Sequence, residues 1–340
     1  MCDSSVCVPR RFRGRILASV LRASRRGSLV CAAFALFTAF AAVLVGLSGP
    51  AGATASPAVA TAPSTPPDLA GTVVTEHSIQ VGGVSRTYRT IAPTALGSAA
   101  HALPLLVVLH GRGQSPWTAV RATGFLPYAR RDQAVLVYPD GLSRSWNAGS
   151  GCCGVAGNRG TPDTAFVATV VAAALRDLPV DPARVYVVGY SNGGKLAWSL
   201  ACVHPALFAA VATYGAVPLT PCPAGRPLPS LLAVGVHDHV LPIGGDPTAH
   251  PPTPSARVAA RWLATRDRCT AAPVGTTEGG AVLSRFSACA AGTAVELAVY
   301  PGVDHNWPAG VTGLMWTFLS ARHSPGSPTR APVAPKPVPA

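Results

Sequence analysis

Residues 184–198 read RVYVVGYSNGGKLAW, and they indicate the fold class more clearly than any other segment. An apolar run typical of a buried strand leads into the pattern Gly-x-Ser-x-Gly at residues 189–193, and a helical pattern follows directly. Glycine permits a sharp turn and a close approach of the backbone. The stretch therefore predicts a strand, a tight turn and a helix that raise the Ser191 hydroxyl above the carboxyl end of a sheet. We interpret Ser191 as a nucleophile and not as a simple turn residue, because a strand precedes the motif and a helix follows it. The helix N-terminus also favours a developing negative charge.

Short apolar runs alternate with helical patterns on both sides of this stretch. Several runs are apolar at every position, as strands covered on both faces are. The alternation predicts a single α/β domain with a mostly parallel central sheet flanked by helices. Alternating patterns at residues 73–80 and 85–91 predict an antiparallel hairpin at one edge. The predicted strands are 105–109, 134–138, 185–188, 209–213, 231–236 and 295–300, and the predicted helices are 163–177, 193–203, 255–266 and 312–321.

A serine hydroxyl is a weak nucleophile, so Ser191 needs a nearby base, and that base needs a carboxylate to orient it. Two later strands end close to such groups. Asp238 follows the strand at 231–236, and His305 lies on the loop after the strand at 295–300. The sequence therefore predicts a Ser191, Asp238, His305 triad in the chain order Ser, Asp, His.

Two alternatives concern the acid. Asp304 is close in sequence to His305, but a residue adjacent to the base rarely reaches its ring nitrogen. The cluster His237, Asp238, His239 could instead bind a metal. Ligands at successive positions of an extended segment diverge, and no motif such as H-E-x-x-H supplies a further ligand, so we predict no metal site.

The loop after the strand at 105–109 reads HGRGQ at residues 110–114. Its small residues would let the backbone N–H of Arg112 join that of Asn192 in an oxyanion hole. We expect the Arg112 side chain to be solvated; the alternative is that it attracts an acidic substrate. His110 is expected to be structural and to bond within its loop.

Three tryptophans fall on loops that are expected at the same face. Aromatic walls are suited to hold an acyl chain or a sugar ring. The candidates for such a wall of the substrate cleft are Trp117, Trp146 and Trp307, of which at least one is expected only to pack its loop.

The N-terminus has the order of a secretory signal peptide. Seven arginines in residues 1–28 precede an uncharged, mostly apolar run at 29–47, and small residues follow. Ser24-Arg25-Arg26 also resembles a twin-arginine signal. The alternative is an uncleaved membrane anchor with the enzyme outside, since the apolar run could span a bilayer. The predicted organisation is a signal peptide at 1–53, a disordered Pro/Ala-rich linker at 54–70, a catalytic domain at 71–322 and a Pro-rich disordered tail at 323–340.

The net charge of +13 is concentrated at the chain ends. Residues 1–28 account for +6 and the tail for +2, which leaves +5 for everything between. A nucleic-acid binder needs a clustered basic stripe, and the sequence between has no basic run. We therefore expect no nucleic-acid partner, and a membrane partner only if the N-terminal segment stays uncleaved.

Six cysteines remain after residue 53, and an even number in an exported chain indicates disulfides. The local pairs Cys202–Cys222 and Cys269–Cys289 are favoured because each closes a short loop. Cys152 and Cys153 would form a strained vicinal bridge or remain free thiols. The alternative for all six is that they are buried, unpaired thiols.

Several segments together resemble the polyhydroxybutyrate-depolymerase-like and feruloyl esterases of the α/β-hydrolase superfamily, over residues 79–319. They are HGRGQS, YPDG followed by SWNAGSGCCG, DPARVYVVGYSNGG, CVHPALFAAVATYGA, GVHDHVLP and GVDHNWP. The resemblance implies an α/β-hydrolase fold, the triad and oxyanion residues named above, and the same two cysteine pairs. The chain departs from many relatives at Arg112, at residues 303–304 and at Pro162, near the cleft or its support.

The function expected from this resemblance is a secreted serine esterase that hydrolyses carboxylic esters through an acyl-enzyme. Short-chain hydroxyalkanoate, feruloyl and acetyl esters are the expected substrates, small or polymeric, and no cofactor is implied. The alternatives are a secreted acyltransferase with the same triad and a non-catalytic binding protein on a hydrolase fold. The sequence indicates no oligomeric state.

Overall fold

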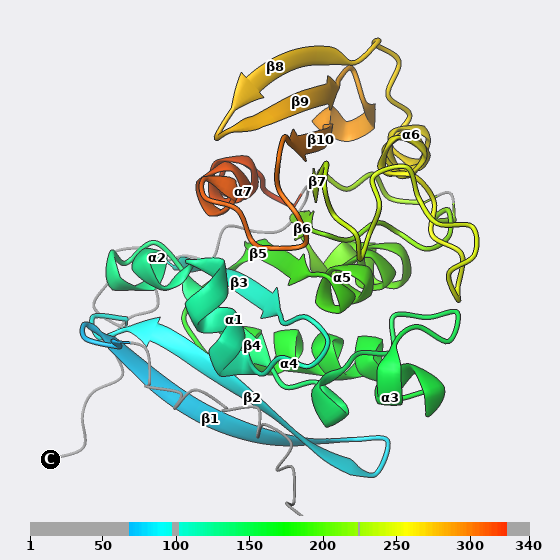
Figure 1. Cartoon of the computed structure of the whole chain (residues 1–340). Coiled ribbons are helices and arrows are strands. Elements are labelled where there is room, and N and C mark those ends of the chain that lie inside the picture. Colours follow the sequence, from blue (N-terminus) through cyan, green and yellow to red (C-terminus); the bar gives the residue numbers. More distant parts are fainter. Residues whose placement is uncertain (1–67, 97–101, 224, 325–340) are drawn as a thin grey trace, which may run out of the picture. The chain divides into compact units, whose positions relative to one another are not determined.

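The computed structural model describes residues 68–96, 102–223 and 225–324 (Figure 1). A ten-stranded sheet in the order β1-β2-β4-β3-β5-β6-β7-β10-β9-β8 runs through this part of the chain. The predicted signal peptide or anchor, most of the predicted linker and nearly all of the predicted tail lie outside the described residues. The strands are β1 (Thr72–Val81), β2 (Val84–Pro93), β3 (Leu103–Leu109), β4 (Val135–Pro139), β5 (Val180–Tyr190), β6 (Ala210–Tyr214), β7 (Ser230–Gly235), β8 (Val274–Glu278), β9 (Ala281–Phe286) and β10 (Val295–Tyr300).

The centre of the sheet is parallel, and both of its edges are antiparallel. Strands β4, β3, β5, β6, β7 and β10 pair in parallel in that order. The β1–β2 hairpin extends one edge and the β8–β9 hairpin extends the other. Since the carboxyl ends of parallel strands share one edge, the loops after β3, β5, β7 and β10 meet there. The predicted mostly parallel sheet is confirmed.

Helices cover both faces of the sheet (Figure 1). Alternate residues of β3 point to opposite sides, so that Val107 packs in one core and Val108 in the other. The first core includes α4 (Asp163–Asp177), α5 (Asn192–Val203) and α6 (Ala256–Arg266), and the second includes α1 (Pro116–Thr123), α2 (Leu126–Arg130) and α7 (Val311–Ser320). The short helix α3 (Gly154–Asn158) lies in the connection between β4 and α4. No helix of the described residues is long and apolar enough to cross a bilayer.

The β8–β9 hairpin was not predicted from the sequence. Every residue of β8 is exposed, and Val274 retains 61% of its accessible surface. A strand that buries neither face lacks the alternation of apolar and polar residues by which strands are recognised. The hairpin forms because β9 pairs with β10 and gives β8 an edge to join.

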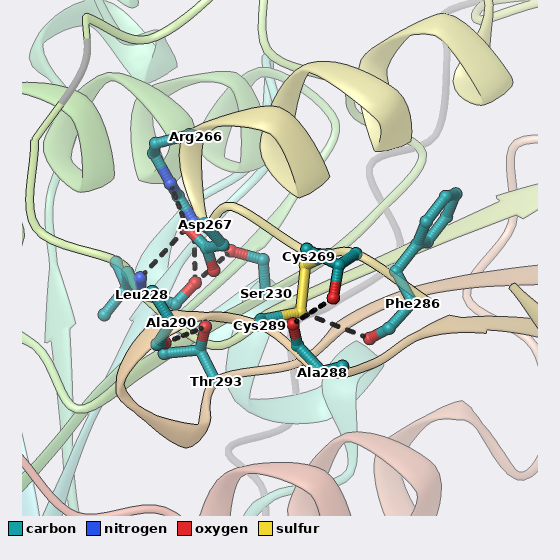
Figure 2. Close-up of a disulfide and its surroundings, with 11 residues drawn as sticks. Leu228, Ser230, Arg266, Asp267, Cys269, Phe286, Ala288, Cys289, Ala290 and Thr293 are labelled. Carbon is teal, nitrogen blue, oxygen red and sulfur yellow. Dashed lines mark hydrogen bonds and ion pairs between the residues drawn. A yellow bond between two sulfur atoms is a disulfide. The ribbon is translucent and has the colours of Figure 1, made fainter. Parts of the chain in front are cut away.

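The Cys269–Cys289 disulfide joins the turn after α6 to the loop between β9 and β10 (Figure 2). Beside it, Arg266 Nε donates to Asp267 Oδ1 at 2.6 Å, and both side chains are buried. Arg266 also donates to Ser230 Oγ at 2.9 Å, at the start of β7. These contacts anchor the end of α6 to the sheet.

Two further disulfides are present in the described residues. Cys202, in α5, is joined to Cys222, and Cys152 is joined to its neighbour Cys153. The structure thus contains the two local pairs that the sequence favoured, and it contains the vicinal bridge instead of two free thiols.

Candidate active site

Ser191 is the single residue between β5 and α5. Its φ of 53° and ψ of −120° are a strained conformation for a residue with a side chain. The turn is tight, because a Cβ added at Gly189 would overlap the backbone of Gly193, and one added at Gly194 would overlap the Ala216 side chain. Close packing therefore requires glycine at Gly189, in the motif, and at Gly194, directly after it.

Ser191, His305 and Asp238 come together at the carboxyl edge of the sheet. Ser191 Oγ lies 2.8 Å from His305 Nε2, and His305 Nδ1 lies 2.7 Å from Asp238 Oδ2. Asp238 can only accept a bond when ionised, so Nδ1 carries the proton and Nε2 is left to accept from the serine. The Asp238 side chain has no exposed surface. Its other oxygen accepts the backbone N–H groups of Val240 and Leu241, at 2.9 and 2.7 Å.

Asp304, the alternative acid, contacts the backbone and not the imidazole. Its Oδ1 accepts the N–H of His305 at 2.6 Å and that of His239 at 3.3 Å. These backbone hydrogen bonds are the main reason why the pKa of Asp304 lies below its ordinary value. Asp304 therefore shapes the loop that carries His305.

The three residues of the cluster His237, Asp238, His239 do not face a common site. The His237 N–H donates to Val303 O at 2.9 Å, while the Asp238 side chain faces His305. No three His, Cys, Asp or Glu side chains within residues 68–96, 102–223 and 225–324 are grouped in a way that could hold a metal ion.

Two tyrosine hydroxyls hold the loop that carries His305. Tyr190 donates to His305 O, and Tyr214 donates to Asp304 O at 2.8 Å. Burial, and secondarily the charge of Asp238, raises the pKa of both phenols, so both stay protonated donors. Gly215 also supports the base: its φ is 60°, and an added Cβ would lie 2.9 Å from the imidazole Cε1. Tyr190 fills a variable position of Gly-x-Ser-x-Gly, and Tyr214 and Gly215 lie in the segment CVHPALFAAVATYGA, but neither pattern assigns them a role.

The loop after β3 lies against the first turn of α5. A Cβ added at Gly193 would overlap the carbonyl groups of Leu109 and His110. This close approach brings Arg112 and Asn192 to the same side of Ser191, where all three line one pocket. Neither the Arg112 N–H nor the Asn192 N–H has an acceptor among the described residues. Both donors remain available to a ligand.

The Asn192 side chain binds the loop before α3 through a pair of hydrogen bonds. Its Oδ1 accepts from Trp146 N at 2.8 Å, and its Nδ2 donates to Trp146 O at 3.0 Å. Trp146 Nε1 in turn donates to His110 O at 2.8 Å. Asn192 is thereby held through its side chain while its backbone N–H stays free.

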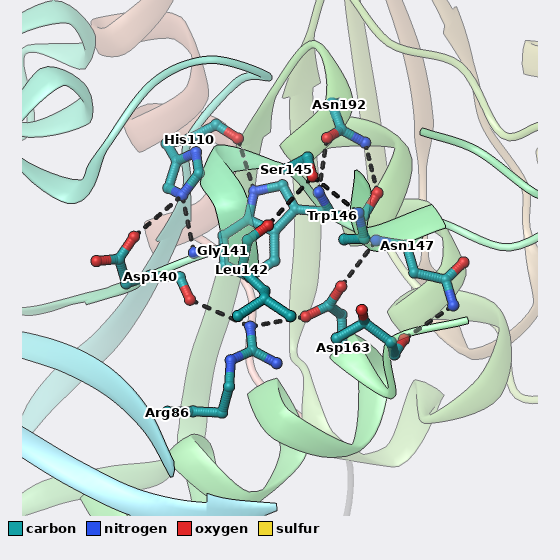
Figure 3. A network of polar contacts seen from close by, with 12 residues as sticks. Arg86, His110, Asp140, Gly141, Leu142, Ser145, Trp146, Asn147, Asp163 and Asn192 are labelled. Atoms are coloured by element: carbon teal, nitrogen blue, oxygen red, sulfur yellow. Dashed lines mark hydrogen bonds and ion pairs between the residues drawn. The ribbon is translucent and has the colours of Figure 1, made fainter. Parts of the chain in front are cut away.

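His110 is a buried, neutral member of this network (Figure 3). Its Nδ1 lies 2.8 Å from Gly111 O, within its own loop as expected, and its Nε2 accepts the N–H of Gly141 at 3.0 Å. Burial lowers the pKa of His110 to about 4. Because Nε2 is an acceptor, its 3.8 Å contact with Asp140 is not an ion pair.

A buried ion pair supports the same loop from the β1–β2 side (Figure 3). Arg86 of β2 donates to Asp163 Oδ1 at 2.8 Å, and both side chains are almost fully buried. The other Asp163 oxygen accepts the N–H of Asn147, the residue after Trp146, at 2.7 Å. This network could not be predicted from the sequence, because its members lie far apart in the chain.

Ser191 opens into a pocket of about 270 Å³. Its wall includes the Cys152–Cys153 disulfide and the side chains of Arg112 and Lys195. The cysteine pair thus lies at the site, which the sequence did not predict.

The expectation that Trp146 lines the cleft is wrong. Its side chain is fully buried and packs against the His110 ring, since its indole N–H bonds to the backbone there. Trp117 and Trp307 are partly exposed but do not line the pocket at Ser191. Trp307 packs against Tyr190, Tyr214 and Phe125, behind the base.

Comparisons with known proteins find esterases. A family model described as Esterase PHB depolymerase matches residues 88–223. The chain is 32% identical over 286 residues to the protein named "Putative esterase NocK" of Nocardia uniformis subsp. tsuyamanensis, over 76% of this chain and 81% of the relative. It is 28% identical over 231 residues to feruloyl esterase C of Emericella nidulans, over 64% of this chain and 77% of the relative.

Solved structures show the same fold. An acetyl xylan esterase from Aspergillus awamori aligns with a TM-score of 0.55 and 14% identity, over 72% of this chain and 98% of the other. A thermostable esterase aligns with a TM-score of 0.50 and 17% identity, over 75% of this chain and 64% of the other. The fold is that of the α/β-hydrolases. From its sequence relatives, the chain belongs to the Esterase PHB depolymerase family and is a carboxylic ester hydrolase.

Proposed function

We propose that this protein is a secreted serine esterase in which Ser191 is the nucleophile, His305 the general base and Asp238 the group that orients the base. The observation that carries the proposal is the continuous hydrogen-bond chain from Ser191 through His305 to the enclosed carboxylate of Asp238, at 2.8 and 2.7 Å. Such a chain supplies both the activated hydroxyl and the correct imidazole tautomer.

The reaction proceeds in two halves. Ser191 Oγ attacks the ester carbonyl while His305 Nε2 takes its proton, and the oxyanion accepts the N–H groups of Arg112 and Asn192. The C–O bond to the alcohol breaks as His305 returns the proton to the leaving oxygen, which gives an acyl-Ser191. Water then attacks the acyl group with His305 as base, and the acid leaves.

The size of the pocket favours short acyl groups or a single ring. A cavity of ~150 Å³ is enough for benzene, and the pocket at Ser191 holds about 270 Å³. Short hydroxyalkanoate, acetyl and feruloyl esters all fit this limit. The family description and the relative named feruloyl esterase C support the same range.

Export is part of the proposal. The arginine-rich N-terminus followed by an apolar run supports a signal peptide. Three disulfides in the described residues support an oxidising compartment.

The test is hydrolysis of p-nitrophenyl esters from acetate to octanoate, and of methyl ferulate, by the full chain expressed in an exporting bacterial host. We expect turnover with short acyl groups and a loss of at least about 10³-fold in kcat in Ser191→Ala. Ser85→Ala, which changes an exposed serine of β2, serves as the matched control and keeps its activity.

Two results would contradict the proposal. Equal turnover by Ser191→Ala and the unaltered protein would assign the chemistry to another nucleophile. No turnover of any ester by either protein would favour a binding protein on this fold.

A further inference from the structure

Two cations line the pocket at Ser191 without an ion-pair partner. They are Arg112, from the loop after β3, and Lys195, from the first turn of α5. Every carboxylate in the described residues lies more than 4 Å from both, and neither side chain has a hydrogen-bond partner there. Arg112 is exposed and Lys195 is half-buried, whereas the fully buried Arg86 and Arg266 each have an aspartate within 3 Å.

Both cations are held close to the nucleophile. The Lys195 N–H donates to Ser191 O at 3.0 Å, so Lys195 lies one helical turn beyond the serine. Side chains with this spacing are neighbours, with ~5–6 Å between their Cβ atoms. The Arg112 side chain passes Gly154, where its Cδ would lie 3.4 Å from an added Cβ. The Arg112 side chain thus lies next to Gly154, which lines the same pocket.

Of the two cations, Lys195 is the one that burial makes unfavourable in the absence of an anion. Burial lowers the pKa of Lys195, and the charge of Arg112 lowers it further, which indicates that the two cations repel each other. A carboxylate placed between them would relieve both effects and would accept several hydrogen bonds.

The remaining charged group of the pocket does not neutralise the pair. Asp246 lies in the lining, but its Oδ1 already accepts the N–H and hydroxyl of Thr248 and the N–H of Ala249. His250, which also lines the pocket, carries no negative charge. The wall therefore carries two positive charges and one negative charge, and the carboxylate lies more than 4 Å from both cations.

We propose that Arg112 and Lys195 bind a carboxylate of the substrate, so that the enzyme prefers esters carrying a carboxylate a few bonds from the scissile carbonyl. This inference rests on the proposed esterase function and adds its substrate class. Because Lys195 lies one helical turn from Ser191, a linker of a few carbons spans the distance between them. The side chain of Arg112 then attracts an acidic substrate, while its backbone N–H serves the oxyanion.

The kinetic test compares carboxylates with their amides. Monomethyl succinate and methyl succinamate carry the carboxylate or amide on the acyl side of the ester. In 3-acetoxypropanoate and 3-acetoxypropanamide the carboxylate or amide is on the alcohol side. Hydrolysis is followed by titration of the released acid at pH 7.5. We expect kcat/KM to be at least about tenfold higher for the carboxylate in one pair, the size expected for a charge-assisted hydrogen bond.

Substitution of the lysine tests the cause of this preference. In Lys195→Met the carboxylate-to-amide ratio should fall about tenfold, and the ratio corrects for any general loss of activity. Arg261→Met, which removes one positive charge from the exposed face of α6, is the matched control and should keep the ratio. If Lys195→Met lowers kcat/KM equally for both substrates of a pair, or if neither pair shows a preference, the proposal is overturned while the esterase function stands.

A binding measurement separates this proposal from the esterase function. Calorimetry with Ser191→Ala, which cannot turn over the ester, should give a Kd for monomethyl succinate or 3-acetoxypropanoate about tenfold lower than for its amide. The preference should disappear in Ser191→Ala/Lys195→Met. Equal affinity for carboxylate and amide in Ser191→Ala would overturn the carboxylate site even if the unaltered protein hydrolysed no ester.

Discussion

Asp238 has both carboxylate oxygens engaged, one by the imidazole of His305 and the other by two backbone N–H groups. The residue is therefore fixed in orientation before any substrate arrives. It can hold the imidazole in the tautomer that the reaction needs and stabilise the imidazolium that forms.

We expect Asp238→Asn to lower kcat by about 10³ to 10⁴-fold with little change in KM. The Asn oxygen would take the two backbone N–H groups, and its NH₂ would face His305 Nδ1, which forces the proton onto Nε2. Kinetics with p-nitrophenyl acetate measure this effect. Asp304→Asn, at the alternative acid, should lose less than about tenfold; losses of equal size in the two variants would refute the assignment of Asp238.

His110 predicts a dependence of stability on pH. Its pKa is lowered by burial to about 4, from an ordinary value of about 6.5. Between pH 6.5 and 4 the unfolded chain binds a proton that the folded chain does not, so the free energy of unfolding falls as the pH falls. The difference between the two pKa values corresponds to about 3 kcal/mol in the free energy of unfolding.

Urea unfolding of the unaltered protein and of His110→Gln at pH 7 and pH 4 tests this prediction. The variant is less stable at pH 7, and the difference between the two proteins should shrink by about 3 kcal/mol at pH 4. A difference that is the same at both pH values would show that His110 is not buried and neutral.

At the scale of single residues, the sequence predicted those site residues that follow the end of a strand or belong to a motif. Ser191, Asp238 and His305 each follow a parallel strand, and the structure places them within hydrogen-bonding distance of one another. Trp146 was assigned to the cleft because it lies in a loop. Its side chain is buried because it packs against His110, which lies far from it in the sequence. Lys195 was overlooked because a lysine in a helix usually faces solvent.

At the scale of elements, the loop before α3 depends on support from β2. Arg86 and Asp163 form a buried pair, and Asp163 also holds the backbone of Asn147. Through Trp146 this loop reaches the Asn192 side chain, next to the nucleophile. The β1–β2 hairpin thus stabilises the site as well as the sheet edge.

Asp163→Ala should lower the free energy of unfolding by about 3 to 5 kcal/mol, because it leaves the Arg86 charge buried and unpaired. Chemical denaturation measures the loss. Asp177→Ala removes an aspartate from the exposed pair with Arg176 and should cost no more than about 1 kcal/mol. Similar losses in both variants would mean that the Arg86–Asp163 pair is solvated.

The elements that the sequence predicted are those with a buried face. Helix α4 has the predicted bounds, and α7 begins and ends one residue before the predicted segment. The exposed strand β8 could not be recognised, since its stability comes from pairing with β9 and not from its own pattern.

At the scale of the whole molecule, two disulfides tie helices to neighbouring loops. The Cys202–Cys222 and Cys269–Cys289 pairs each close a sequence separation of 20 residues. A loop of this length stabilises the folded state by about 3 kcal/mol through the entropy of the unfolded chain. We expect the double variant Cys269→Ser/Cys289→Ser to lose about this amount in urea unfolding. An unchanged midpoint would show that this bridge contributes nothing to stability.

Ser191 is the proposed nucleophile of a triad at the carboxyl edge of the sheet. The most direct test is labelling with diisopropyl fluorophosphate, followed by intact mass and peptide mapping. We predict one label per chain, located on Ser191 and absent from Ser191→Ala, with labelling slowed strongly in Asp238→Asn. Labelling of another residue, or no labelling of the unaltered protein, would contradict the account.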